Sequence, residues 1–179
     1  FMQGVSTVGG RLSLSGNKLN SLNGLSSLTR VEERLVLTRL PATNLDGLDA
    51  LTYIGGGLEL SFMTTLTDIS ALSNLTSLGS QVLGDSLYLR DLRNLKNLDG
   101  LENITRLNRS VLLYANGLEN IDGLRNLTYV ENAFGILSHR NLTNVDGLSK
   151  LTEVGGELQL SSNRNLTNEI VSPFTDEII

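Results

Sequence analysis

Hydrophobic residues recur along this chain in a short alternating pattern. Seven segments carry two apolar residues separated by one other residue, as in Leu58-Glu59-Leu60, and Gly-Gly pairs precede several of them. Alternation over so few residues is typical of a β-strand and not of a helix. We therefore predict seven strands, whose inner pairs are Leu12/Leu14, Leu35/Leu37, Leu58/Leu60, Leu87/Leu89, Val111/Leu113, Phe134/Ile136 and Leu158/Leu160.

The strands belong to a repeat. A Gly-Leu pair, replaced once by Ala-Leu, precedes each of the last six strands, at spacings of 23, 24, 29, 23 and 24 residues. One turn of this length cannot bury its apolar face, whereas stacked turns can. We predict a mainly β, right-handed parallel β-solenoid with little helix and about seven coils of 23–24 residues. It forms one domain over 1–168, with coils that begin near residues 1, 24, 47, 71, 100, 123 and 147, and 169–179 form a C-terminal cap or tail.

The spacing of 29 residues marks one irregular coil. Its five extra residues fall within Gly79–Ser86. Insertions in solenoids become surface loops, often on a functional face. We expect either such a functional loop or a tolerated bulge here. Between the main strands we expect short strands, turns and single 3₁₀ turns, because the intervening stretches are too short for a stable helix.

Composition limits the classes of partner and of chemistry that this chain can have. The net charge of −5 and the pI near 4.9 disfavour nucleic acid and anionic membranes. Cysteine is absent, which excludes disulfides, thiol nucleophiles and Cys-ligated metals. No apolar run approaches the roughly 18 residues of a membrane span. The chain begins at Phe1 without the pattern of a signal peptide, so we expect a processed or trimmed chain.

Residues suited to catalysis or metal binding are few. His139 is the single histidine, and we expect it to be structural or exposed, because no second His or Cys can join it in a site. Acidic residues stand just before four anchor glycines, where other coils carry Asn23 or Ser70. This interchange favours turn capping over Ca²⁺ binding. We predict no catalytic residue, no metal, no cofactor and no enzymatic activity. The acidic row is Asp46, Asp99, Asp122 and Asp146.

The repeat GLxxLTxVGGxLxLxxNxxL resembles leucine-rich repeats, and among them the variant in receptor L domains of insulin- and EGF-receptor ectodomains and related microbial surface proteins. The resemblance covers essentially the whole chain. It implies a solenoid that serves in adhesion, ligand binding or scaffolding, and an Asn ladder after the strands. This ladder is partial here: Asn17, Asn116 and Asn163 are present, while Leu40, Met63, Leu92 and His139 take the other positions. The chain also lacks the cysteines that usually cap such receptor domains.

Six sequons for N-glycosylation point to a secreted protein. Three of them share one position in successive coils, and two share another. The alternative is that the Thr is structural, since Thr29, Thr52, Thr76, Thr105, Thr128 and Thr152 hold one position whatever precedes them. The candidate glycosylated residues are Asn74, Asn103, Asn108, Asn126, Asn141 and Asn165.

The middle residue of each alternating strand points away from the core. Outward positions are small and polar at the solenoid ends, whereas the central strands carry a patch of Tyr88, Arg90, Leu112, Tyr114 and Leu137. Tyr and Arg within an apolar patch suit a protein interface.

We therefore expect a non-catalytic, extracellular or cell-surface recognition or adhesion module that binds a protein or glycan partner. The alternative is a structural subunit of a coat or filament, which would bind copies of itself through its open ends. A carbohydrate-active enzyme on a β-helix scaffold is a third, weaker reading, because no clustered catalytic side chains are in register.

Overall fold

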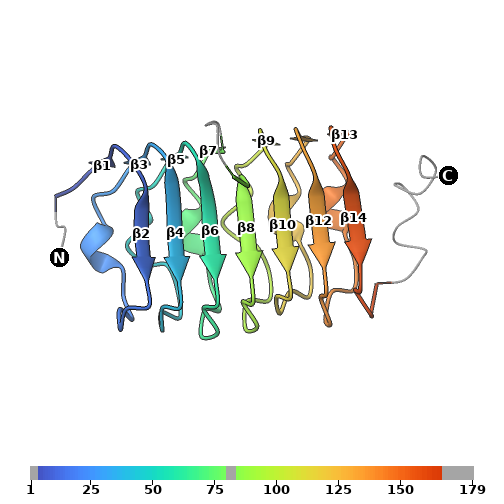
Figure 1. The fold of residues 1–179 in the computed structure, drawn as a ribbon, viewed down its shortest axis with the longest axis horizontal. Coiled ribbons are helices and arrows are strands. Elements are labelled where there is room, and N and C mark those ends of the chain that lie inside the picture. Colours follow the sequence, from blue (N-terminus) through green and yellow to red (C-terminus); the bar gives the residue numbers. More distant parts are fainter. Residues whose placement is uncertain (1–3, 80–83, 167–179) are drawn as a thin grey trace.

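A computed structural model describes residues 4–79 and 84–166 as a single stack of coils. The prediction of a mainly β solenoid with parallel strands is confirmed, with about seven turns. Figure 1 shows the main strands side by side, all pointing the same way, with β2 and β14 at opposite ends of the stack. The tail at 169–179, and residues 80–83 of the predicted insertion, lie outside the described residues.

The main sheet has seven strands in the order β14-β12-β10-β8-β6-β4-β2. Each alternating segment of the sequence forms one of them, and each pairs with the equivalent residues of the next coil, so that Leu58 lies opposite both Leu35 and Leu87. The strands are β2 (Leu12–Ser15), β4 (Arg34–Thr38), β6 (Gly57–Ser61), β8 (Leu87–Arg90), β10 (Val111–Tyr114), β12 (Phe134–Leu137) and β14 (Leu158–Ser161).

A second row of two-residue strands runs just before the main strands in each coil. It forms a four-stranded and a three-stranded sheet, and the break falls beside the coil that carries the extra residues. These strands are β1 (Thr7–Val8), β3 (Arg30–Val31), β5 (Tyr53–Ile54), β7 (Ser77–Leu78), β9 (Arg106–Leu107), β11 (Tyr129–Val130) and β13 (Glu153–Val154).

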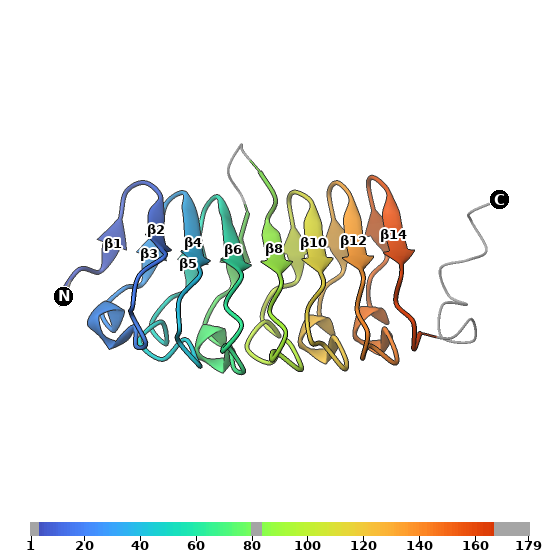
Figure 2. The same ribbon diagram turned by 60° about the horizontal axis from the view of Figure 1, so that its bottom comes forward.

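Among the described residues, helix is limited to single 3₁₀ turns between the main strands, as predicted, and these lie at four of the six anchor pairs. They lie together along one side of the stack (Figure 2). Their bounds are η1 (Asn23–Leu25), η2 (Ser70–Leu72), η3 (Asp122–Leu124) and η4 (Asp146–Leu148).

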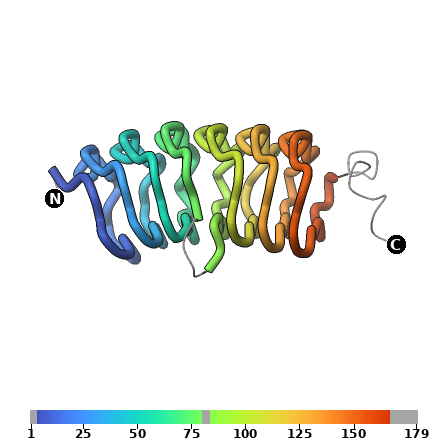
Figure 3. Tube along the Cα trace, turned by 90° about the horizontal axis from the view of Figure 1, so that it is seen from above, coloured from blue at the N-terminus to red at the C-terminus, as the bar shows by residue number. Residues whose placement is uncertain are grey.

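The core is a set of aliphatic columns that run the length of the stack. Seen from above, the coils follow one another as flattened loops around this core (Figure 3). The inner residues of β4, β6 and β8, such as Leu35, Leu60 and Leu89, are at most 1% exposed. The equivalent Leu158 and Leu160 of the last strand are only partly buried. A core Leu→Ala change costs about 2–5 kcal/mol, so each inner position contributes strongly to stability.

Every main strand is followed directly by a residue with left-handed backbone. Gly16 is the only glycine among the seven, so six residues accept the strain of a positive φ. At this residue the chain leaves the sheet, but the backbone N–H of the residue still donates to the next coil, as in Arg39 N–H to the Ser61 carbonyl at 3.0 Å. The other five non-glycine residues are Phe62, Asp91, Ala115, Ser138 and Ser162.

Ladders of polar side chains tie the coils together. The Thr ladder foreseen in the sequence is present: Thr52 Oγ1 donates to the Thr29 carbonyl at 3.2 Å, and Thr152 Oγ1 donates to the Thr128 carbonyl at 3.0 Å. The same bond is made by Thr29, Thr76 and Thr128 to the coil before each of them. These bonds give Thr76 and Thr128, which belong to the sequons of Asn74 and Asn126, a structural role.

Candidate functional site: the outer face of the main sheet

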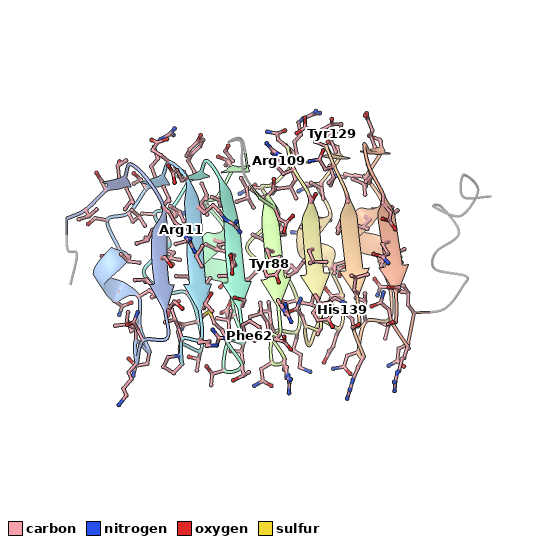
Figure 4. The ribbon with its side chains drawn as sticks, in the orientation of Figure 1. Arg11, Phe62, Tyr88, Arg109, Tyr129 and His139 are labelled. Carbon is pink, nitrogen blue, oxygen red and sulfur yellow. The ribbon has the colours of Figure 1, made fainter. Side chains whose placement is uncertain are left out.

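The predicted patch is contiguous on the outer face of β8, β10 and β12. Leu112 lies opposite Tyr88 on one side, and Tyr114 lies between Arg90 and Leu137. All five side chains are half-buried. Tyr88 projects from the middle of the sheet (Figure 4). The register of the repeat thus assembles residues of neighbouring coils, 23 or 24 positions apart, into one surface.

Two arginine side chains, Arg90 and Arg39, contact the aromatic rings in and beside this patch. The Arg90 guanidinium lies 5.3 Å from the centre of the Tyr114 ring and 5.1 Å from that of Phe62, and its Nη1 donates to the Tyr88 hydroxyl at 3.4 Å. Arg39 lies over the same Phe62 ring, 4.8 Å from its centre. These cation–π contacts hold the aromatic rings in place.

Sequence reasoning missed Phe62 and Arg39, because both occupy the left-handed position after a strand and not an outward position within one. The only signal was the recurrence of that position in every coil. The N-terminal half of the outer face also differs from the expectation of exposed outward residues: Val36, Thr38 and Ser61 are at most 8% exposed. The Thr38 and Ser61 hydroxyls lie 3.0 Å apart and share a hydrogen bond.

A cluster of charged side chains, Arg34, Glu59 and Asp85, lies next to these buried residues of the outer face. Arg34 Nη2 contacts Glu59 Oε2 at 3.1 Å. Burial raises the pKa of the nearby Asp85, Arg34 opposes this rise, and the charge of Glu59 adds to it. Asp85 also lines a shallow cavity of about 230 Å³ over Gly135, with Glu157 on another side. Asp85 lies within Gly79–Ser86, where the insertion is predicted, but the sequence pattern does not single out this side chain.

His139 is fully buried, so of the two roles foreseen for it only the structural one remains. Burial lowers its pKa to about 4. Its Nε2 lies 3.5 Å from Asn116 Nδ2, while its buried Nδ1 has no partner among the described residues. Figure 4 places His139 at the lower end of β12.

The Asn ladder is partial, as predicted, and the structure shows which backbone groups its side chains bind. Asn116 accepts from the Leu92 N–H and donates to the Leu89 carbonyl, both at 3.0 Å. Asn163 accepts from the His139 N–H at 2.9 Å and donates to Ile136 at 2.8 Å. Each amide thus joins two backbone groups of the preceding coil.

The prediction that the acidic row caps the turns is wrong. The Asp46, Asp99, Asp122 and Asp146 side chains are exposed. The Asp46 carboxylate accepts from the Asn44 side-chain amide at 2.7 Å and not from a turn N–H, and in all four residues it is the backbone N–H that binds within the turn. The acceptor is the side chain two residues earlier, as in Asp122 N–H to Asn120 Oδ1 at 3.1 Å. The same bond recurs at Asn44, Asn97 and Asn144, and at Ser21 and Asp68 in the coils without an acidic anchor.

Three sequon asparagines also bridge coils. Asn74 Nδ2 donates to the Asp49 carbonyl, Asn103 Nδ2 to Ser73 and Asn126 Nδ2 to Glu102, at 2.7–2.9 Å. A glycosylated amide keeps one N–H, so this bond is compatible with a glycan. Glycosylation at these and the other three sequons stays a prediction.

Within residues 4–79 and 84–166, no group of three or more His, Cys, Asp or Glu side chains is placed to hold a metal ion. Over the same part of the chain, no helix has the length and apolar character needed to cross a bilayer. Comparisons with models of protein families, with curated proteins and with solved structures find no match for this chain.

Proposed function

We propose that this chain is a non-catalytic recognition module that acts outside the cell or at the cell surface. We further propose that its solenoid is of the leucine-rich-repeat kind, resembling receptor L domains. It binds a protein partner through the patch of Tyr88, Arg90, Leu112, Tyr114 and Leu137. The observation that carries the proposal is the register that joins these residues across β8, β10 and β12.

The composition of the patch supports this role. Tyr and Arg are the residue types that most often dominate binding energy at protein interfaces, and they do so near the centre of a patch. Here the arginine is already held by three aromatic rings, so little side-chain entropy is lost when a partner binds. Small and polar outward residues such as Ser13 and Gln159 stand toward the two ends.

Binding to an array of secreted proteins and cell-surface ectodomains tests the proposal. The double variant Tyr88→Ser and Leu112→Ser removes two central side chains and should weaken binding at least tenfold. The matched control is Gln159→Ser, at the position equivalent to Tyr88 and Leu112 on β14, which should bind like the original chain. Undiminished binding by the double variant would contradict the role of the patch.

The extracellular location needs a separate measurement. Mass spectrometry of the protein from its natural source should find glycans on one or more of the six sequons. Consistent absence of any glycan would remove the main support for secretion.

One observation favours the second candidate, a subunit of a coat or filament. Strands β2 and β14 are each paired on one side only among the described residues, and the inner leucines of β14 are half-buried. End-to-end contact between such edges would not close and would produce filaments. Light scattering over a wide concentration range decides this: a mass of one chain throughout contradicts assembly.

A further inference from the structure

The coils differ in length at one turn, and this difference shapes the surface. After each main strand the chain passes through a left-handed residue and then a short turn. In coil 4 (71–99) the turn reads Leu92-Arg93-Asn94-Leu95, and in coil 6 (123–146) it reads His139-Arg140-Asn141-Leu142. Coil 5 (100–122) lies between them and reads Asn116-Gly117-Leu118, one residue shorter.

Because the turn of coil 5 is one residue shorter, the row of turns has a notch of about 440 Å³ at this coil. Coil 5 contributes Gly117, which has no side chain to fill the space and lies so close to coil 4 that a Cβ would meet the Arg93 carbonyl. The walls are the longer turns of coils 4 and 6. The residues that give the notch its chemistry are Asp91, Arg93, Tyr114, Ser138, Arg140 and Asn141.

The notch is positively charged although the chain carries −5 overall. Arg93 and Arg140 stand two coils apart, about 10 Å at the usual strand spacing, on opposite sides of Gly117. The one carboxylate in the lining is Asp91, and it contacts both Arg90 at 3.3 Å and Arg93 at 3.7 Å. Among the lining side chains, two arginines against this one carboxylate leave an excess of one positive charge, and Arg90, outside the lining, also pairs with Asp91.

Neighbouring charges do not cancel this excess. Glu119 follows in the turn of coil 5, but its Oε1 contacts Lys96 Nζ at 2.9 Å. The side chain of Arg93 is 74% exposed, and its contact with Asp91 is long, at 3.7 Å, so it can turn from Asp91 toward a ligand. The floor is rigid, because Asn116 is 5% exposed and its amide is bound to the backbone of coil 4.

We propose that this notch binds a sugar that carries a carboxylate, a hexuronate unit at the end of or within a glycan. Two guanidinium groups pair with the carboxylate, and paired bonds of this kind are strong and directional. The Ser138 hydroxyl and the Asn141 amide suit sugar hydroxyls, and the half-buried Tyr114 ring offers a flat surface to the sugar ring. The volume lies within the range of small-ligand sites.

This site is distinct from the protein-binding patch, although Tyr114 borders both. It goes beyond the proposed recognition of a protein partner and does not depend on it. Ligand binding in the notch and glycosylation of Asn141 exclude each other, because a glycan on Asn141 would fill the notch. The test therefore uses protein produced in a host that does not N-glycosylate.

Calorimetric titration with digalacturonic acid is the direct measurement. Neutral digalactose has the same rings without the carboxylates and should bind at least tenfold more weakly, and inorganic phosphate should not compete at equal concentration. Arg140→Gln should weaken digalacturonate binding about tenfold or more. The matched control is Arg164→Gln, at the same turn position in the last coil, outside the notch, and it should change the affinity less than twofold.

A second variant separates the shape of the notch from its charge. Coil 7 already contains the turn Asn163-Arg164-Asn165-Leu166, so replacing Gly117 by Arg-Asn would give coil 5 the same longer turn. This change adds a positive charge yet fills the notch, and it should abolish binding while the thermal unfolding curve shows a folded solenoid.

Three results would each overturn the inference. They are the absence of digalacturonate binding by the original chain at millimolar concentration, equal binding of phosphate, and retained affinity in the filled variant. The Tyr88→Ser and Leu112→Ser variant should bind digalacturonate normally, so failure of the protein-binding proposal and failure of this one give different results.

Discussion

Asn163 accepts a hydrogen bond from the backbone N–H of His139, one coil earlier, at 2.9 Å. Asn116 makes the same bond to Leu92. Because His139 has no side-chain oxygen, it cannot repeat this bond for Asn116. The ladder is therefore interrupted at coil 6, where an imidazole occupies the place of an amide.

Asn116→Ala should destabilise the solenoid by about 2–4 kcal/mol. The change leaves the Leu92 N–H and the Leu89 carbonyl without their partner in a buried setting, and each lost partner costs about 1–3 kcal/mol. Asn17→Ala is the matched control, because Asn17 holds the same position in the first coil and is exposed. Its urea unfolding curve should match that of the original chain, and an equal loss at both positions would show that the buried bonds do not matter.

Acidification should weaken the fold through His139. Its pKa is lowered to about 4 by burial, against 6.5 in the unfolded chain. Above pH 6.5 neither state is charged and the contribution is fully present. Between pH 6.5 and 4 His139 binds a proton in the unfolded chain but not in the folded chain, so the free energy of unfolding falls by about 3 kcal/mol in total.

The comparison with His139→Leu isolates this effect, since Leu40 and Leu92 occupy the same position in other coils. Urea unfolding at a series of pH values gives the free energy of unfolding for both chains. Subtracting one from the other removes the titration of carboxylates, including Asp85. A difference that does not change between pH 7 and 4 would mean that His139 is protonated in the folded state.

Ala115→Gly should stabilise the protein by about 0.5–1 kcal/mol, although glycine usually destabilises. Ala115 has φ +54, where a Cβ costs about 1–2 kcal/mol and glycine costs nothing. Ala50→Gly is the control, because Ala50 lies in a turn without a positive φ, and there the entropy of glycine should lower stability. Shifts of the same sign in the two thermal midpoints would contradict the role of backbone strain.

Gly55→Ala and Gly9→Ala should differ sharply, although both residues begin a Gly-Gly pair at the same place in their coils. A Cβ on Gly55 would lie 2.0 Å from the Glu32 carbonyl oxygen, so the two coils would have to separate. A Cβ on Gly9 meets nothing within 4 Å. We expect a loss of about 3 kcal/mol or more at Gly55 and less than 1 kcal/mol at Gly9, measured by urea unfolding.

The sequence by itself determined the stack. Once Leu35, Leu58 and Leu87 recur in one phase, only equivalent positions can meet, because a shift by one residue would turn every inner side chain outward. The inner columns, the 3₁₀ turns, the Thr ladder and the patch around Leu112 all follow from that phase. The right hand of the solenoid, the glycans and the partner stay predictions.

Tertiary structure alone decided the details that depend on two coils at once. The acceptor for the Asp122 N–H is Asn120 and not the acidic side chain, because bond direction depends on the path of the turn. His139 is buried because coils on both sides cover its position. The notch at Gly117 exists only because the turn of coil 5 is one residue shorter than the same turn in its two neighbours, and a difference between neighbours becomes a surface feature only when they are stacked.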